Sequence, residues 1–233
     1  MPMAENQTKE AMLSEHKTID TAEKTIVFKP KRFYTTVKRV VDILISSVAI
    51  ILLSPLFAIL AILIKIEDGG NVIHKRECIG KKKNYYMLKF RTMVVDADNY
   101  EKYFSPEQLE QYKKEIKLDN DPRITKMGRF LRKTSLDELM QLFNIFKGEM
   151  SLVGPRPVIK EELEFYGKYR ELLLSVPPGL TGYWQTHGRS NSTYESGERQ
   201  QLELYYVEHR SFALDIKILF KTVKVILKGT GAQ

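Results

Sequence analysis

The longest apolar run in the chain occupies residues 40–66 and reads VVDILISSVAIILLSPLFAILAILIKI. It is longer than the roughly 20 residues that a helix needs to cross a bilayer, so it predicts a membrane helix. Pro55 lies near the middle of the run, where it removes a backbone N–H and bends or breaks the helix after Ser54. The Ser54 hydroxyl can donate a hydrogen bond to a carbonyl that the proline frees.

Basic residues flank this run on both sides. Under the positive-inside rule, both ends therefore prefer the cytoplasm. We expect a re-entrant membrane hairpin over residues 31–70 that is broken at Ser54-Pro55 and returns to the side from which it entered. A kinked helix that spans the bilayer once is the alternative from this segment alone. The flanking residues are Lys31, Arg32, Lys38 and Arg39 before the run, and Lys65, Lys75, Arg76 and Lys81 to Lys83 at its end and beyond.

The segment before the run is polar and carries charges of both signs. Because it has no apolar core of its own, residues 1–30 predict a flexible polar tail rather than a cleaved signal peptide. A chain of 233 residues is long enough for one domain with a sizeable core. We therefore expect residues 71–233 to form a single cytoplasmic catalytic domain at the membrane interface.

The pattern after the run is typical of an α+β fold that is mainly helical. Two β-prone pieces, at residues 72–74 and 85–90, are separated by Gly80 and a lysine run and predict a small hairpin. Helical spacing of apolar residues dominates the remaining segments, between turns rich in proline and glycine. The predicted helices cover residues 96–118, with a break at Ser105-Pro106, and residues 135–146, 159–174, 195–208 and 215–228, with a rigid loop at residues 153–157 and a turn at residues 177–179.

The last predicted helix is basic and amphipathic. Four lysines recur at offsets of four, three and four, which puts them on one helical face, while Ile218, Leu219, Val225 and Ile226 occupy other sides. Such an interfacial helix suits an anionic membrane surface. A solvated outer face on a core helix is the alternative. The lysines are Lys217, Lys221, Lys224 and Lys228.

The net charge of +8 implies an anionic partner, which charge alone leaves open among nucleic acid, an acidic membrane and a phosphorylated substrate. The sequence has no helix-turn-helix, RNA-binding aromatic motif or zinc signature, so we expect no nucleic acid partner. Cys78 is the only cysteine, which excludes an internal disulfide, and the four histidines are too scattered for zinc-ligand spacing. These features favour a cytoplasmic catalytic face.

Two adjacent acids, Asp137 and Glu138, lie among several cations. Ser135 precedes Glu138 by three residues, the spacing of a capping box, so Ser135 is predicted to begin a helix. Adjacent helical residues point roughly 100° apart, which predicts separate roles for the two acids, such as nucleophile and metal ligand. Acids that merely complement a helix dipole are the alternative. The neighbouring cations are Arg132, Lys133, Lys147 and Arg156.

The segment LRKTSLDELMQLFNIFKGEMSLVGPRP, residues 131–157, strongly resembles the monotopic phosphoglycosyl transferases. These bacterial sugar transferases begin polysaccharide or glycan assembly on undecaprenyl phosphate. The resemblance covers nearly everything after Arg32, and the motifs follow in the same order. Its further motifs are Ser54-Pro55, KFRTM at residues 89–93, PGLTGYWQTHGR at residues 178–189 and YYVEHRSFALDIKIL at residues 205–219.

The resemblance implies a two-step transfer of a sugar 1-phosphate from a UDP-sugar to undecaprenyl (polyprenyl) phosphate. Asp137 attacks the β-phosphorus, UMP leaves, and a lipid phosphate collects the sugar phosphate from the carboxylate. Glu138 holds Mg²⁺, which prefers oxygen ligands and bridges substrate phosphates. The cations that match the family motifs, and that would neutralise phosphate oxygens, are Lys89, Arg132 and Arg156, with Arg91 and Arg189 as weaker candidates.

The same resemblance implies a bacterial inner (cytoplasmic) membrane enzyme with both termini and the active site cytoplasmic; a homo-oligomer is left open. A membrane-bound glycosyltransferase that releases UDP is the alternative. The chain departs from the family pattern at Arg76 and Cys78, where glutamine and arginine are common before Gly80. It also has Glu203 where an aspartate is usual upstream of Tyr205-Tyr206. The sequence does not identify the sugar.

Overall fold

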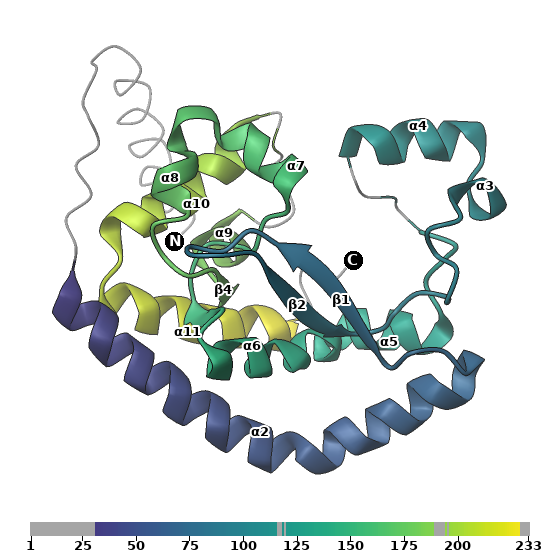
Figure 1. The fold of residues 1–233 in the computed structure, drawn as a ribbon, viewed down its shortest axis with the longest axis horizontal. Helices are drawn as coiled ribbons and strands as arrows, with labels where there is room; N and C mark the ends of the chain where they lie inside the picture. Colours follow the sequence, from purple (N-terminus) through teal and green to yellow (C-terminus); the bar gives the residue numbers. More distant parts are fainter. Residues whose placement is uncertain (1–30, 116–117, 119, 189–193, 195, 229–233) are drawn as a thin grey trace.

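The computed structural model describes residues 31–115, 118, 120–188, 194 and 196–228, so the predicted polar tail at residues 1–30 lies outside it. The long helix α2 lies along one side of the molecule, and two small sheets and a set of short helices fold against it (Figure 1). In chain order the elements are α2 (Arg32–Asp68), β1 (Ile73–Cys78), β2 (Tyr85–Phe90), α3 (Tyr100–Tyr103), α4 (Pro106–Glu115), α5 (Lys126–Thr134), the 3-10 helix η2 (Leu136–Met140), α6 (Gln141–Lys147), β3 (Ser151–Val153), α7 (Lys160–Leu163), the 3-10 helix η3 (Glu164–Tyr169), α8 (Arg170–Leu173), β4 (Gly179–Thr181), α9 (Tyr183–His187), α10 (Glu198–His209) and α11 (Phe212–Lys228).

Helix α2 continues through Pro55. Pro55 has no N–H for the carbonyl of Ile51, one turn earlier. The hydroxyl of Ser54 donates to that carbonyl instead, at 2.8 Å, which confirms the predicted compensation. The predicted break is wrong, because this bond keeps the freed acceptor paired and lets the helix bend rather than end. Figure 1 shows α2 as an arc whose two ends turn toward the rest of the chain.

The outward side of α2 is apolar. The helix is long and apolar enough to cross a membrane by its length and composition, yet 11% of its most apolar 18-residue window is buried. A core helix of a soluble protein buries such a surface, whereas the exposed apolar side of α2 suits contact with a membrane. The exposed apolar side chains are Val40, Val41, Leu44, Ile45, Val48, Ile51, Leu52, Ile59, Ile62, Leu63 and Ile66.

Up to Ser46, the inward side of α2 is polar. A row of side chains recurs every four residues and so shares one face. Its members are Tyr34, Lys38, Asp42 and Ser46. The hydroxyl of Tyr34 and the ammonium of Lys38 each donate to the Asp215 carboxylate at the start of α11, both at 2.8 Å. The start of the membrane helix is therefore attached to the last helix of the chain.

The carboxylate of Asp42 attaches α2 to the core. This side chain is 4% exposed. It accepts the Ser151 hydroxyl at 2.7 Å and the Leu152 N–H at 3.0 Å, both from β3. A buried carboxylate requires such donors because removing the charge from water is otherwise strongly unfavourable. The contact fixes β3 against the membrane helix.

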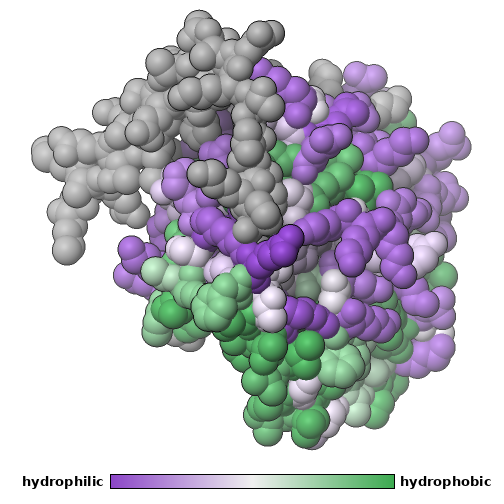
Figure 2. All heavy atoms as spheres, turned by 60° about the vertical axis from the view of Figure 1, so that its left-hand side comes forward, coloured by the Kyte–Doolittle hydropathy of each residue, from purple (hydrophilic) through white to green (hydrophobic). Residues whose placement is uncertain are grey.

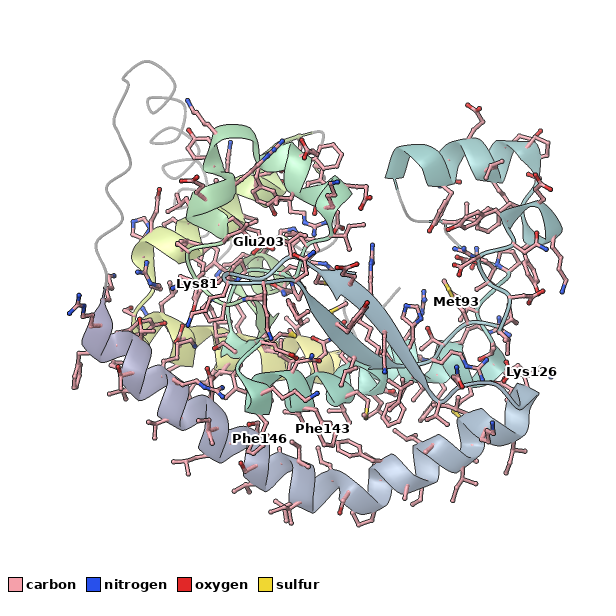
Figure 3. The ribbon with its side chains drawn as sticks, in the orientation of Figure 1. Lys81, Met93, Lys126, Phe143, Phe146 and Glu203 are labelled. Carbon is pink, nitrogen blue, oxygen red and sulfur yellow. The ribbon has the colours of Figure 1, made fainter. Side chains whose placement is uncertain are left out.

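After Ser46, the inward side of α2 becomes apolar, beginning with Ala49, Ile50 and Leu53, which pack against the main core. Leu60 and Ile64 are buried in a cluster with Phe90, Leu131 and Met140. Aromatic rings extend this contact: the ring centroid of Phe57 lies 6.0 Å from that of Phe143, which projects from α6 toward α2 (Figure 3). The second half of α2 thus packs on the elements that carry Lys89 and Asp137.

The predicted hairpin is confirmed. Strands β1 and β2 pair antiparallel, with Ile73 opposite Phe90 and Cys78 opposite Tyr85. The bounds of β2 are those predicted, and β1 extends further than residues 72–74. The buried amide of Asn144 on α6 holds the hairpin in place, because its Oδ1 accepts the Leu88 N–H at 3.0 Å and its Nδ2 donates to the Tyr86 carbonyl at 2.8 Å.

A second sheet, which the sequence did not predict, joins the segment just before the predicted loop at residues 153–157 to the segment just after the predicted turn at residues 177–179. Strands β3 and β4 pair in parallel, with Ser151 beside Gly179 and Val153 beside Thr181. Each strand has three residues, too few to show an alternating pattern, and the partners are far apart in sequence. Gly179 is required at this crossing, because a Cβ atom there would lie 2.1 Å from the backbone nitrogen of Gly154.

The remaining helices largely follow the prediction. The segment 96–118 contains α3 and α4, separated at Ser105 as expected. The predicted helix over residues 159–174 consists of α7, η3 and α8, and Gly167 within η3 interrupts helical geometry with a φ of 46°. Helices α10 and α11 correspond to the helices predicted over residues 195–208 and 215–228, although their boundaries differ.

Helix α11 has an apolar outer face that the lysine pattern does not reveal. Phe212, Ile216, Phe220 and Val223 are exposed and lie at offsets of four, four and three, so they share one face. Phe220 is 74% exposed. Ile218, on another face, is fully buried. Figure 2 shows hydrophobic surface gathered in the lower part of the molecule, with mainly hydrophilic surface above it.

The Asp42 contact predicts a large loss of stability in Asp42→Ala. The substitution leaves two buried donors on β3 unpaired, and we expect the free energy of unfolding to fall by about 2–4 kcal/mol. Thermal and urea unfolding in detergent micelles measures this. Val48→Ala, on the exposed side of α2, is the matched control and should change stability by less than about 0.5 kcal/mol. Equal stability of Asp42→Ala and wild type would contradict the assigned role.

Candidate active site

The segment that carries Asp137 begins with an unusual turn. Helix α5 ends at Thr134, and Ser135 follows it in the left-handed conformation, with a φ of 56°. Ser135 makes no side-chain cap bond to the next helix, so the predicted capping box is wrong. The reason is that Ser135 already ends α5, with its N–H donating to the carbonyls of Leu131 and Arg132.

Asp137 and Glu138 belong to the 3-10 helix η2 rather than to an α-helix. Neighbours in a 3-10 helix point about 120° apart, so the two carboxylates still face different surroundings. Asp137 is 8% exposed, whereas Glu138 is half-buried. The two acids therefore have the separate environments that different chemical roles require.

Burial raises the pKa of Asp137 to about 6. The Lys89 ammonium lowers this pKa, the Glu138 carboxylate raises it, and the Arg132 guanidinium lowers it. Near neutral pH the Asp137 carboxylate is mostly ionised and is more basic than an ordinary aspartate. Such an oxygen is a stronger nucleophile than a fully solvated carboxylate.

Glu138 opens onto a polar cleft. Its Oε1 accepts a hydrogen bond from Lys89 Nζ on β2 at 2.9 Å. The cleft encloses about 510 Å³, including space open to solvent at its mouth. Its cations and acids suit an anionic ligand that carries hydroxyl groups. The lining residues are Arg76, Cys78, Met87, Lys89, Glu138, Gln141, Arg156, Pro157, Ile159, Glu162, Gly179, Leu180 and Gln185.

Arg156 reaches the cleft from the loop after β3. Its backbone N–H donates to Glu203 Oε2 at 2.9 Å. Its guanidinium carbon lies 5.6 Å from the centroid of the Trp184 ring, a cation–π contact. Burial opposes the charge, but the carboxylates of Glu138, Glu162 and Glu203 raise the pKa of Arg156 above its usual value. Arg156 is therefore cationic at any pH at which the protein is folded.

Arg132 lies close to Asp137 without lining the cleft. Its Nε donates to the Thr92 hydroxyl at 3.0 Å. Burial lowers the pKa of Arg132, while the Asp137 carboxylate raises it. Helix α5 can approach Thr92 because Gly128 has no side chain: a Cβ there would lie 2.0 Å from the Thr92 carbonyl oxygen. Arg132 thus contributes positive charge beside Asp137 rather than a group that touches a ligand in the cleft.

Arg91 lies elsewhere. Its guanidinium pairs with the Asp68 carboxylate at the end of α2 and donates to the carbonyls of Asn71 and Met93. It is not a lining residue of the cleft. Arg189, the other weaker candidate, lies outside the described residues. The structure therefore brings Lys89, Glu138 and Arg156 together at the cleft and leaves Arg91 out.

The family model described as bacterial sugar transferase matches residues 33–229, which is most of the chain. The chain belongs to the bacterial sugar transferase family. The predicted resemblance to phosphoglycosyl transferases is thereby confirmed, and the chain is an enzyme of that class.

Three relatives illustrate the range of this family. This chain is 43% identical over 199 residues to the exopolysaccharide production protein ExoY of Rhizobium meliloti, across 84% of this chain and 87% of that protein. It is 43% identical to the undecaprenyl-phosphate galactose phosphotransferase of Salmonella typhimurium, across 87% of this chain and 43% of that protein. It is 36% identical to the UDP-N-acetylgalactosamine-undecaprenyl-phosphate N-acetylgalactosaminephosphotransferase of Aeromonas hydrophila, across 88% of this chain and 47% of that protein. The chain spans less than half of the length of the last two proteins.

Several cleft residues of the sugar transferase escaped sequence reasoning. Gln141 and Glu162 line the cleft but belong to predicted helices whose pattern indicates only packing, and Gln185 lies within the motif at residues 178–189 without an assigned role. Arg76 and Cys78, the departures from the family pattern, also line it, so β1 contributes to the site. The sequence signal that could have identified such residues is a polar residue within an apolar helix face, as at the buried Gln141.

The acids present fit a magnesium ion that arrives with a substrate rather than one held by the protein alone. Among the described residues, no group of three or more His, Cys, Asp or Glu could hold a metal. Mg²⁺ binds commonly through one or two carboxylates together with substrate phosphates and water. Glu138, which faces the cleft, can supply such a ligand, in competition with Lys89.

The raised pKa of Asp137 predicts that Asp137→Asn stabilises the protein above neutral pH. Relative to the unfolded value of 3.8, a carboxyl with a pKa of about 6 favours the folded state at low pH. This contribution to stability is lost as pH rises through about 6, because the buried carboxyl then ionises. Asparagine does not ionise, so the variant does not become less stable in this way. We expect Asp137→Asn to be more stable than wild type at pH 8 by on the order of 2 kcal/mol, with a smaller difference at pH 5.

Unfolding in detergent at both pH values measures this difference. Glu161→Gln, at an exposed acid on α7, should show no pH-dependent effect of that size. A stability difference for Asp137→Asn that grows toward low pH would contradict the predicted sign.

Proposed function

We propose that this sugar transferase moves a sugar 1-phosphate from a UDP-sugar to polyprenyl phosphate and releases UMP. One observation carries the proposal: two adjacent acids lie in different environments beside shared cations. Asp137 is buried with a raised pKa, and Glu138 faces a cleft lined by Lys89 and Arg156. A nucleophile and a metal ligand need this division of environments.

In the first step, a carboxylate oxygen of Asp137 attacks the β-phosphorus of the donor. A phosphorus–oxygen bond forms, the bond to the bridging oxygen breaks, and UMP leaves with that oxygen. The enzyme then carries the sugar phosphate as an acyl phosphate. This step requires the ionised carboxylate, and a pKa of about 6 leaves most of it ionised at neutral pH. It also requires donor binding to make the buried oxygen accessible.

In the second step, an oxygen of polyprenyl phosphate attacks the same phosphorus. The bond to Asp137 breaks, the carboxylate is restored, and the product is a sugar attached to the lipid through a diphosphate. Two displacements at one phosphorus let a single cleft serve two substrates in turn. Ping-pong kinetics follow from this order.

The cations stabilise negative charge on the phosphates. Lys89 and Arg156 line the cleft, and Arg132 adds positive charge beside Asp137. Fixed cations in a partly dehydrated site lower the energy of a phosphoryl transition state. Mg²⁺ bound through Glu138 and the donor phosphates would supply further positive charge on their oxygens. Lys89, now paired with Glu138, would then turn to a phosphate.

The membrane helix brings this site to the lipid substrate. Residues 40–66 would extend about 40 Å as a straight helix, longer than a hydrocarbon core of about 30 Å. The arc of α2, with both ends turned to one side, supports a continuous re-entrant helix that enters and leaves on the cytoplasmic face of the bacterial inner membrane (Figure 1). The basic residues at both ends support the same orientation.

Helix α11 supports this placement at the interface. Its exposed row of Phe212, Ile216, Phe220 and Val223 suits the acyl boundary, and Lys217 and Lys224 suit anionic headgroups. The start of α11 is attached to the start of α2 through Asp215. Both helices would therefore contact the same leaflet.

The named sugars of the relatives include galactose and N-acetylgalactosamine, so these names do not select one donor sugar for this chain.

The product of the reaction tests the proposal. Purified enzyme is incubated with a panel of UDP-sugars, Mg²⁺ and polyprenyl phosphate, and the released nucleotide is identified. We expect UMP with at least one donor. Release of UDP would instead indicate a glycosyltransferase that moves the sugar without its phosphate.

Two variants separate the roles of the acids. Asp137→Asn should abolish turnover and prevent trapping of protein labelled from a UDP-sugar with a radioactive β-phosphate, since no acyl phosphate can form. Glu138→Gln should retain Asp137 and raise the Mg²⁺ concentration needed for half-maximal rate about tenfold or more. Full activity in Asp137→Asn would remove the covalent mechanism.

Membrane topology is tested by labelling single cysteines in a Cys78→Ala background. Arg32→Cys lies at the first residue of α2 and Asn71→Cys just after its end, and Asp98→Cys in the catalytic domain is the control for the cytoplasmic side. In intact spheroplasts, a membrane-impermeant maleimide should label none of the three, and after lysis it should label all of them. Labelling at only one flank of α2 in intact spheroplasts would indicate a single span.

A further inference from the structure

Glu203 lies in the interior of the domain without an assigned role. It belongs to α10, is 1% exposed and is labelled inside the molecule in Figure 3. Its Oε2 accepts the backbone N–H of Arg156 at 2.9 Å. A fully buried carboxylate is unfavourable unless its charge is needed, because an amide could accept the same hydrogen bond at a smaller desolvation cost.

The loop that carries Arg156 has few groups by which it can be held. Pro155 and Pro157 have no N–H, so Arg156 supplies the one backbone donor between Gly154 and Val158. The flanking backbone groups are bound by strands: Gly154 N donates to the Thr181 carbonyl and Gly179 N to the Pro155 carbonyl, while the Val158 carbonyl accepts the Ile79 N–H. The central donor goes to the side chain of Glu203.

Positive charge faces Glu203 from two sides. Arg199, one turn earlier on α10, and Arg156 both lower the pKa of Glu203, while burial and Glu162 raise it. The guanidinium of Arg199 lies over the rings of Trp184, at 4.4 Å, and Tyr194, at 4.0 Å. Arg156 lies over the same Trp184 ring. The phenols of Tyr166 and Tyr194 are the other titratable groups that interact with Glu203.

We propose that Glu203 is a positioning residue for the transfer reaction: its carboxylate binds the Arg156 N–H and, balanced by Arg199, fixes the Arg156 guanidinium against the donor phosphates. The inference rests on the proposed function. Its geometric basis is the single donor of the Pro155–Pro157 segment and the shared contact of both arginines with Trp184. Glu203 itself does not line the cleft, so it acts through Arg156.

The ionisation of Glu203 gives the role a measurable signature. Burial raises the pKa of Glu203 to about 7. The ionised carboxylate accepts a stronger hydrogen bond than the neutral acid, so Arg156 is held more firmly as pH rises through about 7. Donor binding should therefore improve across this range, in addition to the effect of Asp137 near pH 6.

The test compares Glu203→Gln and Glu203→Ala with wild type in the full-length enzyme. The KM for the UDP-sugar, the KM for polyprenyl phosphate and kcat are measured from pH 5.5 to 8.5. Glu203→Ala should raise the donor KM about tenfold or more, because a buried N–H loses its acceptor, and should change the lipid KM little. Glu203→Gln keeps an acceptor, so it should recover most of the donor KM while losing the pH dependence near pH 7. Glu208→Gln, on the same helix, is the matched control.

Each outcome bears on the proposal. A donor KM in Glu203→Ala equal to that of wild type would overturn the positioning role, and a wild-type pH profile in Glu203→Gln would overturn the role of its charge. If Glu203→Ala fails to fold, the pH profile of Glu203→Gln decides alone. If wild type releases no UMP from any donor, the proposed function fails, whereas normal wild-type turnover with unaffected Glu203 variants rejects the positioning role alone.

Discussion

An apolar helix in a membrane can be joined to a catalytic domain specifically only through its inward side. In α2 that side begins with a row of polar groups that ends at Ser46, and the buried Asp42 carboxylate in this row makes the contact on which the others depend. Apolar packing alone would allow the helix to rotate or slide, because lipid offers a similar environment. Paired hydrogen bonds to Ser151 and Leu152 allow one register only.

This contact extends directly to the chemistry. Asp42 holds β3, β3 pairs with β4, and the chain leaves β3 through Gly154 into the loop that presents Arg156. On the other side of Pro55, the helix packs on Phe90 and Leu131, which adjoin Lys89 and Arg132. The two halves of one helix therefore fix the cations on two sides of the site. Depth in the bilayer and geometry at the phosphates are set by the same element.

Local patterns predicted much of the fold. The β2 strand, the compensation of Pro55 by Ser54 and the last helix depend on residues close in sequence, and the structure agrees with each. What failed depends on distant partners. Strands β3 and β4 are too short to carry a pattern. A helix does begin after Ser135 as predicted, but the Ser135 side chain makes no capping bond to it, because Ser135 also ends α5.

The residues of the site divide in the same way, into those that a local motif identifies and those that depend on distant partners. Motif resemblance identified Lys89, Glu138 and Arg156, which meet at the cleft. It gave Arg91, two residues from Lys89, only as a weaker candidate, although both would share a face if the strand continued. Strand β2 ends at Phe90, so Arg91 turns to Asp68 instead. The bond between Glu203 and Arg156 joins residues 47 positions apart, and no local signal predicts it.

The hydrogen bond from Ser54 to the Ile51 carbonyl has a consequence for how the chain is made. Both the proline that causes the bend and the hydroxyl that satisfies the freed carbonyl lie within five consecutive residues. The bend therefore needs no contact with any later segment. The helix can take its curved shape during translation, before the residues after Asp68 leave the ribosome, and can enter the membrane already shaped for the domain that will fold against it.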